Sequence, residues 1–292
     1  MKISVVIPTM DEPAIQDVLD EVFDAMRGQN IEVIVVDKSK DETARRAAQK
    51  GARVIHQERK GYGDAYLTGF KHVSEDTDVV VILDGDKTYD PYDIPALIAI
   101  LNEGADLVIG NRLQLMDKEA MSKRNVFGNR MLTALLRSLY HVPISDSQSG
   151  MRAIKFAALN RLKLQSAHMP FASEMIIEAQ KAGLNIAETP IKYRKRVGHP
   201  KLDPFRDAFS IVFMTIRLVR DYNPIVIFLP IGLVLFLVGI GYGAGILLEY
   251  IHTGIVTRFA GSILSVLLIL TGVQIMLFGL LADIILTNLR RR

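Results

Sequence analysis

Two aspartates separated by one glycine, Asp84-Gly-Asp86, are the residues of this sequence best placed to do chemistry. They follow an apolar run at residues 79–83, which is typical of a buried strand that ends at the first aspartate. Two carboxylates at a strand end can hold a hard divalent cation, and Mg²⁺ is commonly bound by one or two carboxylates together with phosphate oxygens. A surface turn is the alternative for such a triplet taken alone. Because the apolar run before the triplet is typical of a buried strand, a metal–diphosphate site with Asp84 and Asp86 as ligands is favoured.

Three other apolar runs also end in polar or charged residues. The first run ends in Pro8-Thr-Met-Asp-Glu12, the second in Asp37, and the third is followed by Lys60-Gly-Tyr-Gly63. The carboxyl ends of parallel strands share one edge of a sheet, and ligands bind beyond that edge. A single acidic strand end commonly caps the next helix, and this is the interpretation preferred for Asp41. Four polar strand ends together predict a binding site.

The elements that would position these residues alternate between strand and helix. Period and composition predict strands at residues 3–7, 31–36, 53–56, 79–83 and 107–110, and helices at residues 17–26, 41–50, 65–73 and 94–102. Such alternation predicts an α/β fold with a largely parallel sheet covered by helices on both faces.

The hydrophobic residues outside this region are concentrated near the end of the chain. Residues 225–248 and 259–282 each form a run of 24 residues without a charge (248 − 225 + 1 and 282 − 259 + 1). A helix needs about 20 apolar residues to cross the hydrocarbon core of a bilayer. The sequence therefore predicts a two-helix transmembrane hairpin at residues 224–285, followed by a basic tail at residues 286–292. Two spans exclude a polytopic transporter.

The charges that flank the two spans predict their orientation. The connecting loop has one basic residue that is always charged, Arg258, whereas Arg290, Arg291 and Arg292 follow the second span. Positive charge marks the cytoplasmic side of a membrane. The first ten residues hold an apolar run of only three, below the roughly 7–15 residues of a signal-peptide core. We therefore expect a cell-membrane protein whose globular part and both termini are cytoplasmic.

The globular part has an uneven distribution of charge. Residues 1–106 carry 12 Lys plus Arg and 21 Asp plus Glu (12 − 21 = −9), whereas residues 107–224 carry 19 and 9 (19 − 9 = +10). An acidic half suits a metal site, and a basic half suits an anionic membrane or a phosphorylated ligand. Nucleic acid is not expected as a partner, because the basic residues lead directly into the membrane spans. The chain has no cysteine, which excludes disulfides, thiolate zinc sites and a cysteine nucleophile.

Two basic amphipathic stretches connect the globular part with the membrane. Residues 204–223 predict a helix with an apolar face formed by Phe205, Ala208, Phe209, Val212, Phe213, Ile216 and Val219. A similar stripe of Phe127, Met131, Leu135 and Leu139 is flanked by Arg124, Arg130 and Arg137. Basic amphipathic helices can lie in the membrane interface. Packing against the protein core is the alternative. It is equally open for residues 125–140 and less favoured for residues 205–220, which lead into the first span.

Seven sequence blocks together carry a family resemblance. They are Val5-Val-Ile-Pro-Thr-Met-Asp-Glu12, Val35-Val-Asp37, Lys60-Gly-Tyr-Gly-Asp-Ala65, Asp84-Gly-Asp86, Gly110-Asn-Arg112, Asp146-Ser-Gln-Ser-Gly-Met-Arg152 and Arg196-Val-Gly-His-Pro-Lys-Leu202. With these blocks the chain resembles the family 2 glycosyltransferases, most closely the branch that makes dolichyl- or polyprenyl-phosphate sugars. The resemblance implies a GT-A type, Rossmann-like nucleotide-sugar-binding domain over residues 1–203.

The resemblance also implies roles on the donor side. Pro8, Thr9, Glu12, Asp37 and Lys60 would line the nucleotide pocket, while Asp84 and Asp86 would serve Mg²⁺ or Mn²⁺ and the diphosphate. Arg196 and Lys201 would form a cationic clamp over the donor, although basic residues just before a membrane can also contact lipid headgroups. The chain departs from the family pattern at Asp11, Lys38 and Thr88, where Asn, Asp and Gln are frequent.

On the acceptor side, the resemblance implies Arg112, Arg124 and Ser149 as contacts for a lipid phosphate. A phosphate monoester is already an anionic nucleophile at neutral pH, since its second pKa is about 6, so it needs cationic positioning more than a general base. Asp146 matches the place of an acidic base in relatives of other specificity, and here it would either act as a base or orient an arginine. Asp86, Arg112, Arg124 and Asp146 are thus the expected catalytic residues.

The predicted function is the inverting transfer of a hexose, of mannose or glucose type, from a GDP- or UDP-linked sugar to dolichyl or polyprenyl phosphate. Two alternatives stay open: transfer to another membrane lipid, such as a lipid-linked oligosaccharide or diacylglycerol, and a scaffold without catalysis. The acidic pair with Arg112 and Lys201 argues against a scaffold. A processive polymer synthase is not expected, because the chain lacks Trp and the Gln-x-x-Arg-Trp element. The oligomeric state is left open by the sequence.

Overall fold

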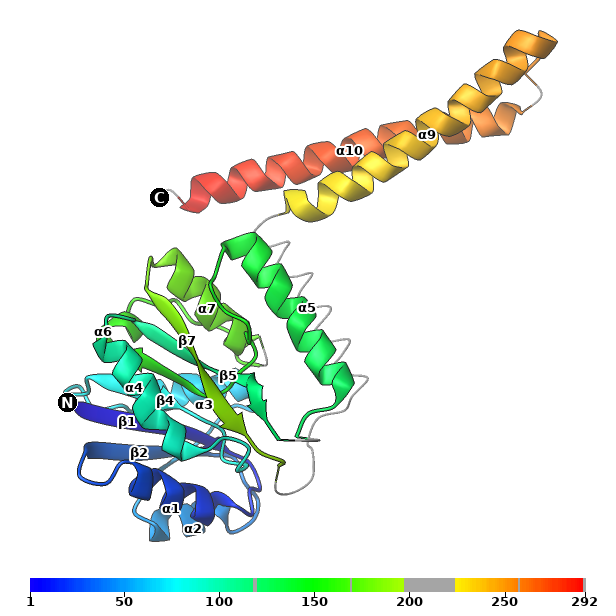
Figure 1. Cartoon of the computed structure of the whole chain (residues 1–292). Coiled ribbons are helices and arrows are strands. Elements are labelled where there is room, and N and C mark those ends of the chain that lie inside the picture. Colours follow the sequence, from blue (N-terminus) through cyan, green and yellow to red (C-terminus); the bar gives the residue numbers. More distant parts are fainter. Residues whose placement is uncertain (118–119, 169, 197–223, 257, 291–292) are drawn as a thin grey trace. The chain divides into compact units, whose positions relative to one another are not determined.

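The computed structural model describes residues 1–117, 120–168, 170–196, 224–256 and 258–290. The chain divides into two compact units, Met1–Pro204 and Phe205–Arg292. The first unit is an α/β domain, and the second contains a helical hairpin (Figure 1). The segment 204–223, for which an interfacial helix is predicted, lies outside the described residues.

One seven-stranded sheet forms the centre of the α/β domain. Its strands, in the spatial order β3-β2-β1-β4-β6-β5-β7, are β1 (Lys2–Thr9), β2 (Asn30–Asp37), β3 (Arg53–His56), β4 (Val79–Ile82), β5 (Leu107–Met116), β6 (Arg152–Lys155) and β7 (Ile186–Tyr193). The pairs β1–β2, β1–β4, β2–β3 and β5–β7 are parallel. Only β6 runs in the opposite direction, antiparallel to both β4 and β5. The predicted largely parallel sheet is therefore confirmed.

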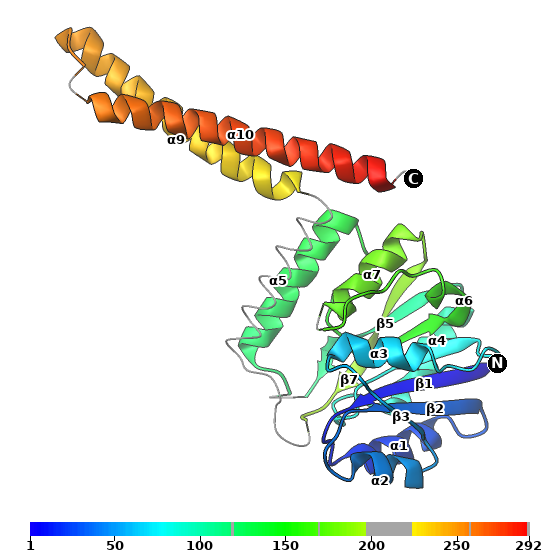
Figure 2. The same ribbon diagram turned by 180° about the vertical axis from the view of Figure 1, so that it is seen from behind.

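Helices cover both faces of this sheet (Figures 1 and 2). One face carries α1 (Ile15–Ala25), α2 (Thr43–Gln49), the 3₁₀ turn η1 (Pro91–Asp93) and α4 (Ile94–Asn102). The other carries α3 (Tyr62–Phe70) and α7 (Phe171–Lys181), and α5 (Lys123–Tyr140) contacts α7. The short α6 (Phe156–Leu159) follows β6 directly.

Alternate residues of the central strands supply the two halves of the core. Ile3, Val5 and Ile7 of β1 are fully buried on the side of α1 and α4. Val6 lies against α3, where Gly69 is so close that a Cβ would stand 2.3 Å from Val6 Cγ1. Strands buried on both faces read as continuous apolar runs in the sequence, not as alternating patterns. This explains why β1, β2 and β4 could be located from the sequence.

The structure adds elements that the sequence analysis did not predict. Strands β6 and β7 were missed, β5 continues six residues beyond the predicted end at residue 110, and α3 begins at Tyr62 instead of residue 65. Strand β6 has Arg152 at one end and Lys155 at the other, so it shows no apolar run. It is a strand because its backbone groups pair with β4 and β5 on either side.

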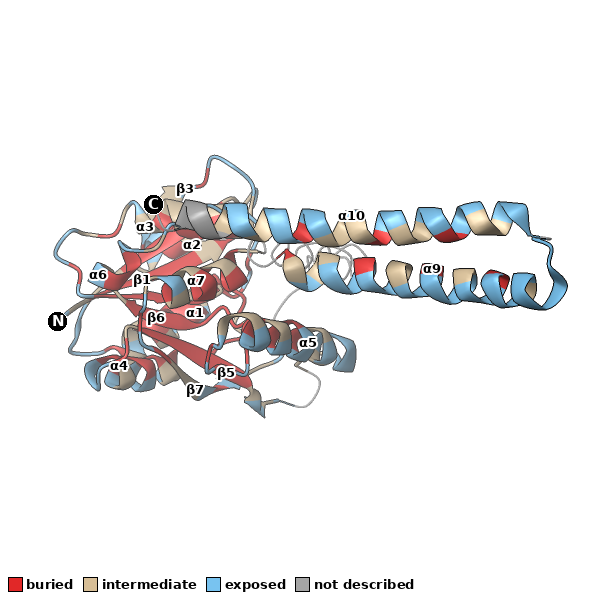
Figure 3. Ribbon diagram, turned by 90° about the horizontal axis from the view of Figure 1, so that it is seen from above, coloured by how far each residue is buried: buried red, intermediate tan, exposed pale blue. Residues whose placement is uncertain are grey.

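The second unit contains two long antiparallel helices, α9 (Ile225–Thr253) and α10 (Phe259–Arg290). Both are long and apolar enough to cross a membrane, and both predicted spans lie within them. Their surfaces are mostly exposed (Figure 3). Small residues line the contact between them: a Cβ at Gly232 would stand 2.6 Å from the carbonyl oxygen of Gly272, and Ser265 Oγ donates to Gly239 O at 2.8 Å. Close backbone approach of this kind is typical of membrane helix pairs.

Candidate active site

Asp84 lies at the carboxyl end of β4, where two tyrosines of α3 hold its side chain. The hydroxyls of Tyr62 and Tyr66 donate to Asp84 Oδ1 at 3.1 and 3.0 Å. The other oxygen, Oδ2, faces the backbone of Gly150, where a Cβ would stand only 2.8 Å away. Helix α3 begins in the Lys60-Gly-Tyr-Gly63 block, and that block therefore supplies groups that orient Asp84.

The environment of Asp84 disfavours its charge. Burial, followed by repulsion from Asp86, raises the pKa of Asp84 from 3.8 to about 6. Burial and the neighbouring Asp84 carboxylate also raise the pKa of Tyr62 and Tyr66 well above the usual value, so both phenols stay protonated and can donate. A buried carboxylate pair of this kind is a group that a bound cation would stabilise.

Asp86 is held from one side and faces a guanidinium on the other. Its Oδ1 accepts hydrogen bonds from both the backbone N–H and the hydroxyl of Thr88. Its Oδ2 lies 3.4 Å from Arg196 Nη1, and Arg196 Nη2 donates to Glu12 Oε1 at 3.1 Å. Arg196 thus bridges Glu12 and Asp86, two residues predicted for the donor site. Thr88, at a departure from the family pattern, orients Asp86.

The two aspartates suit a divalent cation that takes its remaining ligands from a diphosphate. In both Asp84 and Asp86, neighbouring hydroxyl groups donate to Oδ1, and Oδ2 accepts none of these hydrogen bonds. In the described part of the chain no group of three or more His, Asp or Glu side chains could by itself hold a metal ion. This donor set fits Mg²⁺ or Mn²⁺, which leave positions for phosphate oxygens and water, better than Zn²⁺.

The ends of β1 and β2, for which a nucleotide pocket is predicted, lie on the same edge of the sheet. Thr9 Oγ1 donates to Asp37 Oδ1 at 2.7 Å, and Ser39 N donates to Asp37 Oδ2 at 3.0 Å. Lys38 does not face Asp37 but donates through Nζ to the carbonyls of Gln57 and Glu58 at 2.7 and 2.8 Å, which ties the end of β2 to the end of β3. Pro8 is half-buried and Lys60 is exposed on the same edge.

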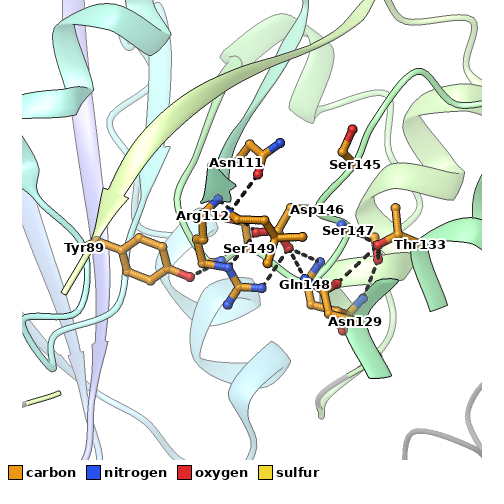
Figure 4. A network of polar contacts seen from close by, with 12 residues as sticks. Tyr89, Asn111, Arg112, Asn129, Thr133, Ser145, Asp146, Ser147, Gln148 and Ser149 are labelled. Carbon is orange, nitrogen blue, oxygen red and sulfur yellow. Dashed lines mark hydrogen bonds and ion pairs between the residues drawn. The ribbon is translucent and has the colours of Figure 1, made fainter. Parts of the chain in front are cut away.

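A buried ion pair joins β5 to the loop before β6. Arg112 Nε and Nη2 donate to Asp146 Oδ2 and Oδ1, both at 2.8 Å, in a bidentate arrangement (Figure 4). Asn129 Nδ2 donates to the same carboxylate at 2.6 Å. Burial alone would raise the pKa of Asp146, but the charge of Arg112 and these hydrogen bonds lower it below its ordinary value. The geometry therefore matches the orienting role predicted for Asp146 and makes it a weak base.

The other side of β5 faces a cavity that the sequence analysis did not predict. It has a volume of about 340 Å³ and is lined by Asn111, Leu113, Gln114, Arg130, Thr133, Ala134, Arg137 and Ser145. Asn111 and Ser145 are labelled beside the Arg112–Asp146 pair in Figure 4. Arg130 and Arg137 are seven residues apart on α5, and no ion pair within the described ranges engages either of them. This spacing on one helical face is the sequence signal that could have revealed the cavity.

Helix α5 exposes part of the predicted apolar stripe instead of packing it on the core. Its buried residues are Asn129, Leu132, Thr133 and Leu136. Phe127 is 68% exposed and Met131 48%, and Leu115 on the neighbouring strand is 51% exposed. Arg124 is exposed near the start of the helix and does not line the cavity. An exposed apolar stripe beside arginines is typical of a helix that contacts a membrane.

The remaining predicted residues lie elsewhere or outside the described ranges. Ser149 is fully buried, and its hydroxyl has no hydrogen-bond partner among the described residues. Lys201, predicted for the donor clamp, lies outside the described residues.

The fold and this edge of the sheet define a nucleotide-sugar transferase of the GT-A type. Residues 4–163 match the family model for glycosyl transferase family 2, and residues 223–288 match the GtrB C-terminal hairpin. The chain belongs to glycosyl transferase family 2 and is a glycosyltransferase. The hairpin match, together with the two apolar helices, indicates association with a membrane.

Similar curated proteins include three from Haloferax volcanii. The low-salt glycan biosynthesis hexosyltransferase Agl6 is 36% identical over 292 residues, which cover 95% of this chain and 67% of that protein. A dolichyl-phosphate hexose transferase is 36% identical over 201 residues, 69% of this chain and 86% of that protein. The glycosyltransferase AglJ is 29% identical over 289 residues, 98% of this chain and 94% of that protein.

Among solved structures, the chain is similar to glucosyl-3-phosphoglycerate synthase from Mycobacterium tuberculosis. The complex of that enzyme with Mn²⁺, UDP-glucose and phosphoglyceric acid matches with a TM-score of 0.61 and 26% identity, covering 74% of this chain and 79% of that one. A complex with Mn²⁺, UDP and glucosyl-3-phosphoglycerate matches with a TM-score of 0.61 and 25% identity, covering 76% and 79%. These neighbours support the use of a divalent metal by the fold.

Proposed function

We propose that this protein transfers a hexose, of mannose or glucose type, from a GDP- or UDP-linked sugar to the phosphate of a dolichyl or polyprenyl phosphate. The observation that carries the proposal is the buried Arg112–Asp146 pair: the charge of Arg112 acts on Asp84 of the acidic site, and Asn111 and Leu113, its neighbours on β5, line the arginine-lined cavity. This arrangement supports a site for an anionic donor and a neighbouring site for an anionic acceptor, with Arg112 close to both. The name of the dolichyl-phosphate hexose transferase relative supports the same acceptor class.

On the donor side, Asp84 and Asp86 would hold Mg²⁺ or Mn²⁺, which when bound offsets the negative charge that develops on the departing diphosphate. Asp37 and Thr9 would contact the nucleoside, with Pro8 and Lys60 on the same edge. Arg196 already reaches Asp86 and would add a positive charge at the diphosphate. Lys201 is proposed for the same clamp from its sequence match alone.

On the acceptor side, we place the lipid phosphate at the arginine-lined cavity, between Arg130 and Arg137 and the end of β5. Arg112 would then stand between the acceptor phosphate and the sugar, held by Asp146 in an orientation that leaves its Nη1 for a ligand. Arg124 and Ser149, the contacts implied by the resemblance, become less direct candidates, because one lies outside the cavity and the other is fully buried.

In the proposed reaction, an oxygen of the acceptor phosphate attacks the anomeric carbon of the sugar. The new carbon–oxygen bond forms on the face opposite the nucleotide, while the bond to the diphosphate oxygen breaks and the nucleoside diphosphate leaves. The attacking phosphate is already deprotonated at neutral pH, since its second pKa is about 6. Asp146 therefore needs to accept no proton, in agreement with its lowered pKa.

The hairpin and α5 support a proposal for the membrane arrangement. We propose that α9 and α10 span the membrane, with the catalytic unit, residues 1–203, and both termini on the cytoplasmic side. The exposed Phe127 and Met131 of α5 would contact the same cytoplasmic leaflet and bring the cavity to the lipid phosphate. Residues 204–223 would add a second interfacial helix.

The experiment that tests this function is a product analysis. Full-length protein in detergent is incubated with dolichyl phosphate, Mn²⁺ or Mg²⁺, and one of GDP-mannose, UDP-glucose or UDP-N-acetylglucosamine, and the lipid product is identified by its mass. A dolichyl-phosphate sugar from one donor is expected, and none from an Asp86→Ala variant. Transfer to diacylglycerol, or to a lipid-linked oligosaccharide, with none to dolichyl phosphate would contradict the proposed acceptor.

A further inference from the structure

Arg152 is a buried cation without a carboxylate partner in the described part of the chain. It is the largest fully buried side chain, with 1% of its surface exposed. Its three guanidinium nitrogens all donate to backbone carbonyls: Nε to Ser149 at 2.9 Å, Nη1 to Ala172 at 2.7 Å and Nη2 to Ser147 at 3.0 Å. Buried charges are normally paired, so an arginine satisfied by carbonyls alone is unusual.

The position of Arg152 in the sheet is beneath the candidate active site. It begins β6 and pairs with Ile82 of β4 on one side and with Ile109 of β5 on the other. Those two strands lead, two and three residues later, to Asp84 and Arg112. Arg152 therefore lies on the strand between the one that leads to the candidate metal site and the one that leads to the buried ion pair.

One set of contacts runs from Arg152 to Asp84 through the segment 147–150. Two of its three hydrogen bonds fix the carbonyls of Ser147 and Ser149. The next residue, Gly150, lies against Asp84 Oδ2, and its N–H donates to the hydroxyl of Tyr89 at 2.6 Å. A displacement of this segment would therefore change the space available to Asp84 Oδ2.

A second set of contacts runs through helix α7. Arg152 holds the carbonyl of Ala172, and the adjacent Phe171 stacks on Tyr66 with ring centroids 5.2 Å apart and an interplanar angle of 13°. Tyr66 in turn donates to Asp84 Oδ1 at 3.0 Å. The two sets of contacts thus reach opposite oxygens of the same carboxylate.

A cross-link joins the two sets independently of Arg152. Gln148 Nε2 donates to Ser173 Oγ at 2.8 Å, which connects the segment 147–150 to the first turn of α7. The segment 147–150 and the first turn of α7, which lead to the two oxygens of Asp84, are therefore hydrogen-bonded to each other. Arg152 donates hydrogen bonds to both.

We propose that Arg152 is a positioning residue that fixes the Asp84 carboxylate for the metal–nucleoside diphosphate, through Gly150 on one side and through Phe171 and Tyr66 on the other. The inference rests on the proposed function. Arg152 itself touches neither Asp84 nor the open edge of the site, so it acts only through these neighbours.

The test compares Arg152→Lys with the control Arg161→Lys in full-length protein. Lysine keeps the charge, but a single nitrogen cannot reach three carbonyls that lie in the directions of the guanidinium fork. Arg161 also donates to a backbone carbonyl, that of Ala182, but it is exposed, and Ala182 follows the last residue of α7, at the opposite end of that helix from Phe171. Binding of UDP and of GDP is titrated with and without Mn²⁺, and thermal unfolding is recorded for each variant.

We expect Arg152→Lys to weaken Mn²⁺-dependent nucleotide binding by roughly 10- to 100-fold, the range found when a group supporting a metal ligand is lost. The KM for the nucleotide sugar should rise, while the KM for dolichyl phosphate should stay within about twofold of the parent value. Arg161→Lys should match the parent in Mn²⁺-dependent nucleotide binding and in both KM values. A purely structural role would lower the unfolding temperature and the active fraction and leave both KM values unchanged.

Unchanged Mn²⁺-dependent binding in a folded Arg152→Lys variant would overturn this inference alone. A parent protein that binds neither UDP nor GDP in the presence of Mn²⁺ would overturn the proposed function and the inference with it. If Arg152→Lys does not fold, Phe171→Leu interrupts only the contacts through α7. That variant should weaken the same binding by at least threefold, and unchanged binding there would also contradict the proposal.

Discussion

Arg196 Nη1 lies 3.4 Å from Asp86 Oδ2, so one carboxylate of the candidate metal site is in contact with a cation supplied by the protein itself. The same guanidinium donates to Glu12 Oε1 at 3.1 Å. A divalent ion at Asp84 and Asp86 would have to share Asp86 with Arg196 or displace it. The arginine that is proposed to bind the donor diphosphate is therefore also a competitor of the metal when no donor is bound.

Replacing Arg196 by Gln should consequently affect the two ligands in opposite directions. Without nucleotide, the affinity for Mn²⁺ should rise by roughly three- to tenfold, because a like charge near the ion is lost. The KM for the nucleotide sugar should rise tenfold or more, since a charge-assisted contact is worth about 1.5–3 kcal/mol. The control is Arg194→Gln, because Arg194 pairs with Glu21 and Asp90, both at 2.7 Å, and not with Asp86. Weaker binding of both Mn²⁺ and the nucleotide sugar in Arg196→Gln would contradict a competition between Arg196 and the metal.

Asp84→Asn should stabilise the domain at neutral pH while abolishing transfer. A carboxyl whose pKa is raised in the folded state, here from 3.8 to about 6, contributes a stability that is complete below its unfolded pKa and is lost as the pH rises through about 6. Two pKa units correspond to roughly 3 kcal/mol as an upper limit. The variant should therefore unfold at a higher temperature than the parent at pH 7.5 and at a similar temperature near pH 4. Thermal unfolding without metal decides, and a variant less stable at pH 7.5 would rule out this effect.

Metal binding should depend on pH because protons compete for the same carboxylate. With the pKa of Asp84 near 6, the Asp84 carboxyl is mostly protonated below that pH and mostly ionised above it when no metal is bound. The apparent affinity for Mn²⁺ should be constant above about pH 7 and fall by up to tenfold per pH unit below 6. Titration of Mn²⁺ at pH 5, 6, 7 and 8 tests this. A flat profile over that range would show that Asp84 does not bind the ion.

Breaking the buried Arg112–Asp146 pair should strongly lower the free energy of unfolding of the domain. Removing one member of a buried ion pair leaves an uncompensated charge and typically costs 3–5 kcal/mol. We expect that loss for Arg112→Gln and for Asp146→Asn, and a double variant that is much less unstable than the sum of the two. Denaturant unfolding of the three variants measures the coupling. Additive losses would mean that the two side chains act independently.

The arginines of the cavity should matter more for the lipid than Arg124 does. Arg130→Gln and Arg137→Gln should each raise the KM for dolichyl phosphate by tenfold or more, with little change in the KM for the nucleotide sugar. Arg124→Gln, on the same helix but outside the cavity lining, is the matched control and should change the acceptor KM by less than threefold. A larger rise in the acceptor KM for Arg124→Gln than for the two cavity variants would instead assign the acceptor phosphate to Arg124.

The sequence by itself determined the α/β architecture and the edge of the sheet that carries the site. Strands β1, β2 and β4 are buried on both faces, so they read as apolar runs, and their ends at Asp37 and Asp84 follow directly from those runs. The two helices of the hairpin were equally visible, because a membrane span needs a long uncharged segment. Each of these features depends on one continuous stretch of residues, so the pattern within that stretch was enough to predict it.

Only the tertiary structure decided which polar groups meet. Strand β6 has charged residues at both ends and becomes a strand through pairing with neighbours more than 40 residues away along the chain. That pairing places Arg152 between the strands that lead to Asp84 and to Arg112, and Asp146, in the loop before β6, binds Arg112. The packing of α5 places Arg130 and Arg137 at the cavity beside β5. Such contacts depend on how separate elements pack, whereas periodicity reports only which face of one element is apolar. For this reason the sequence predicted Asp84 and Asp86 but not the tyrosines, the glycine and the buried arginine that hold them in place.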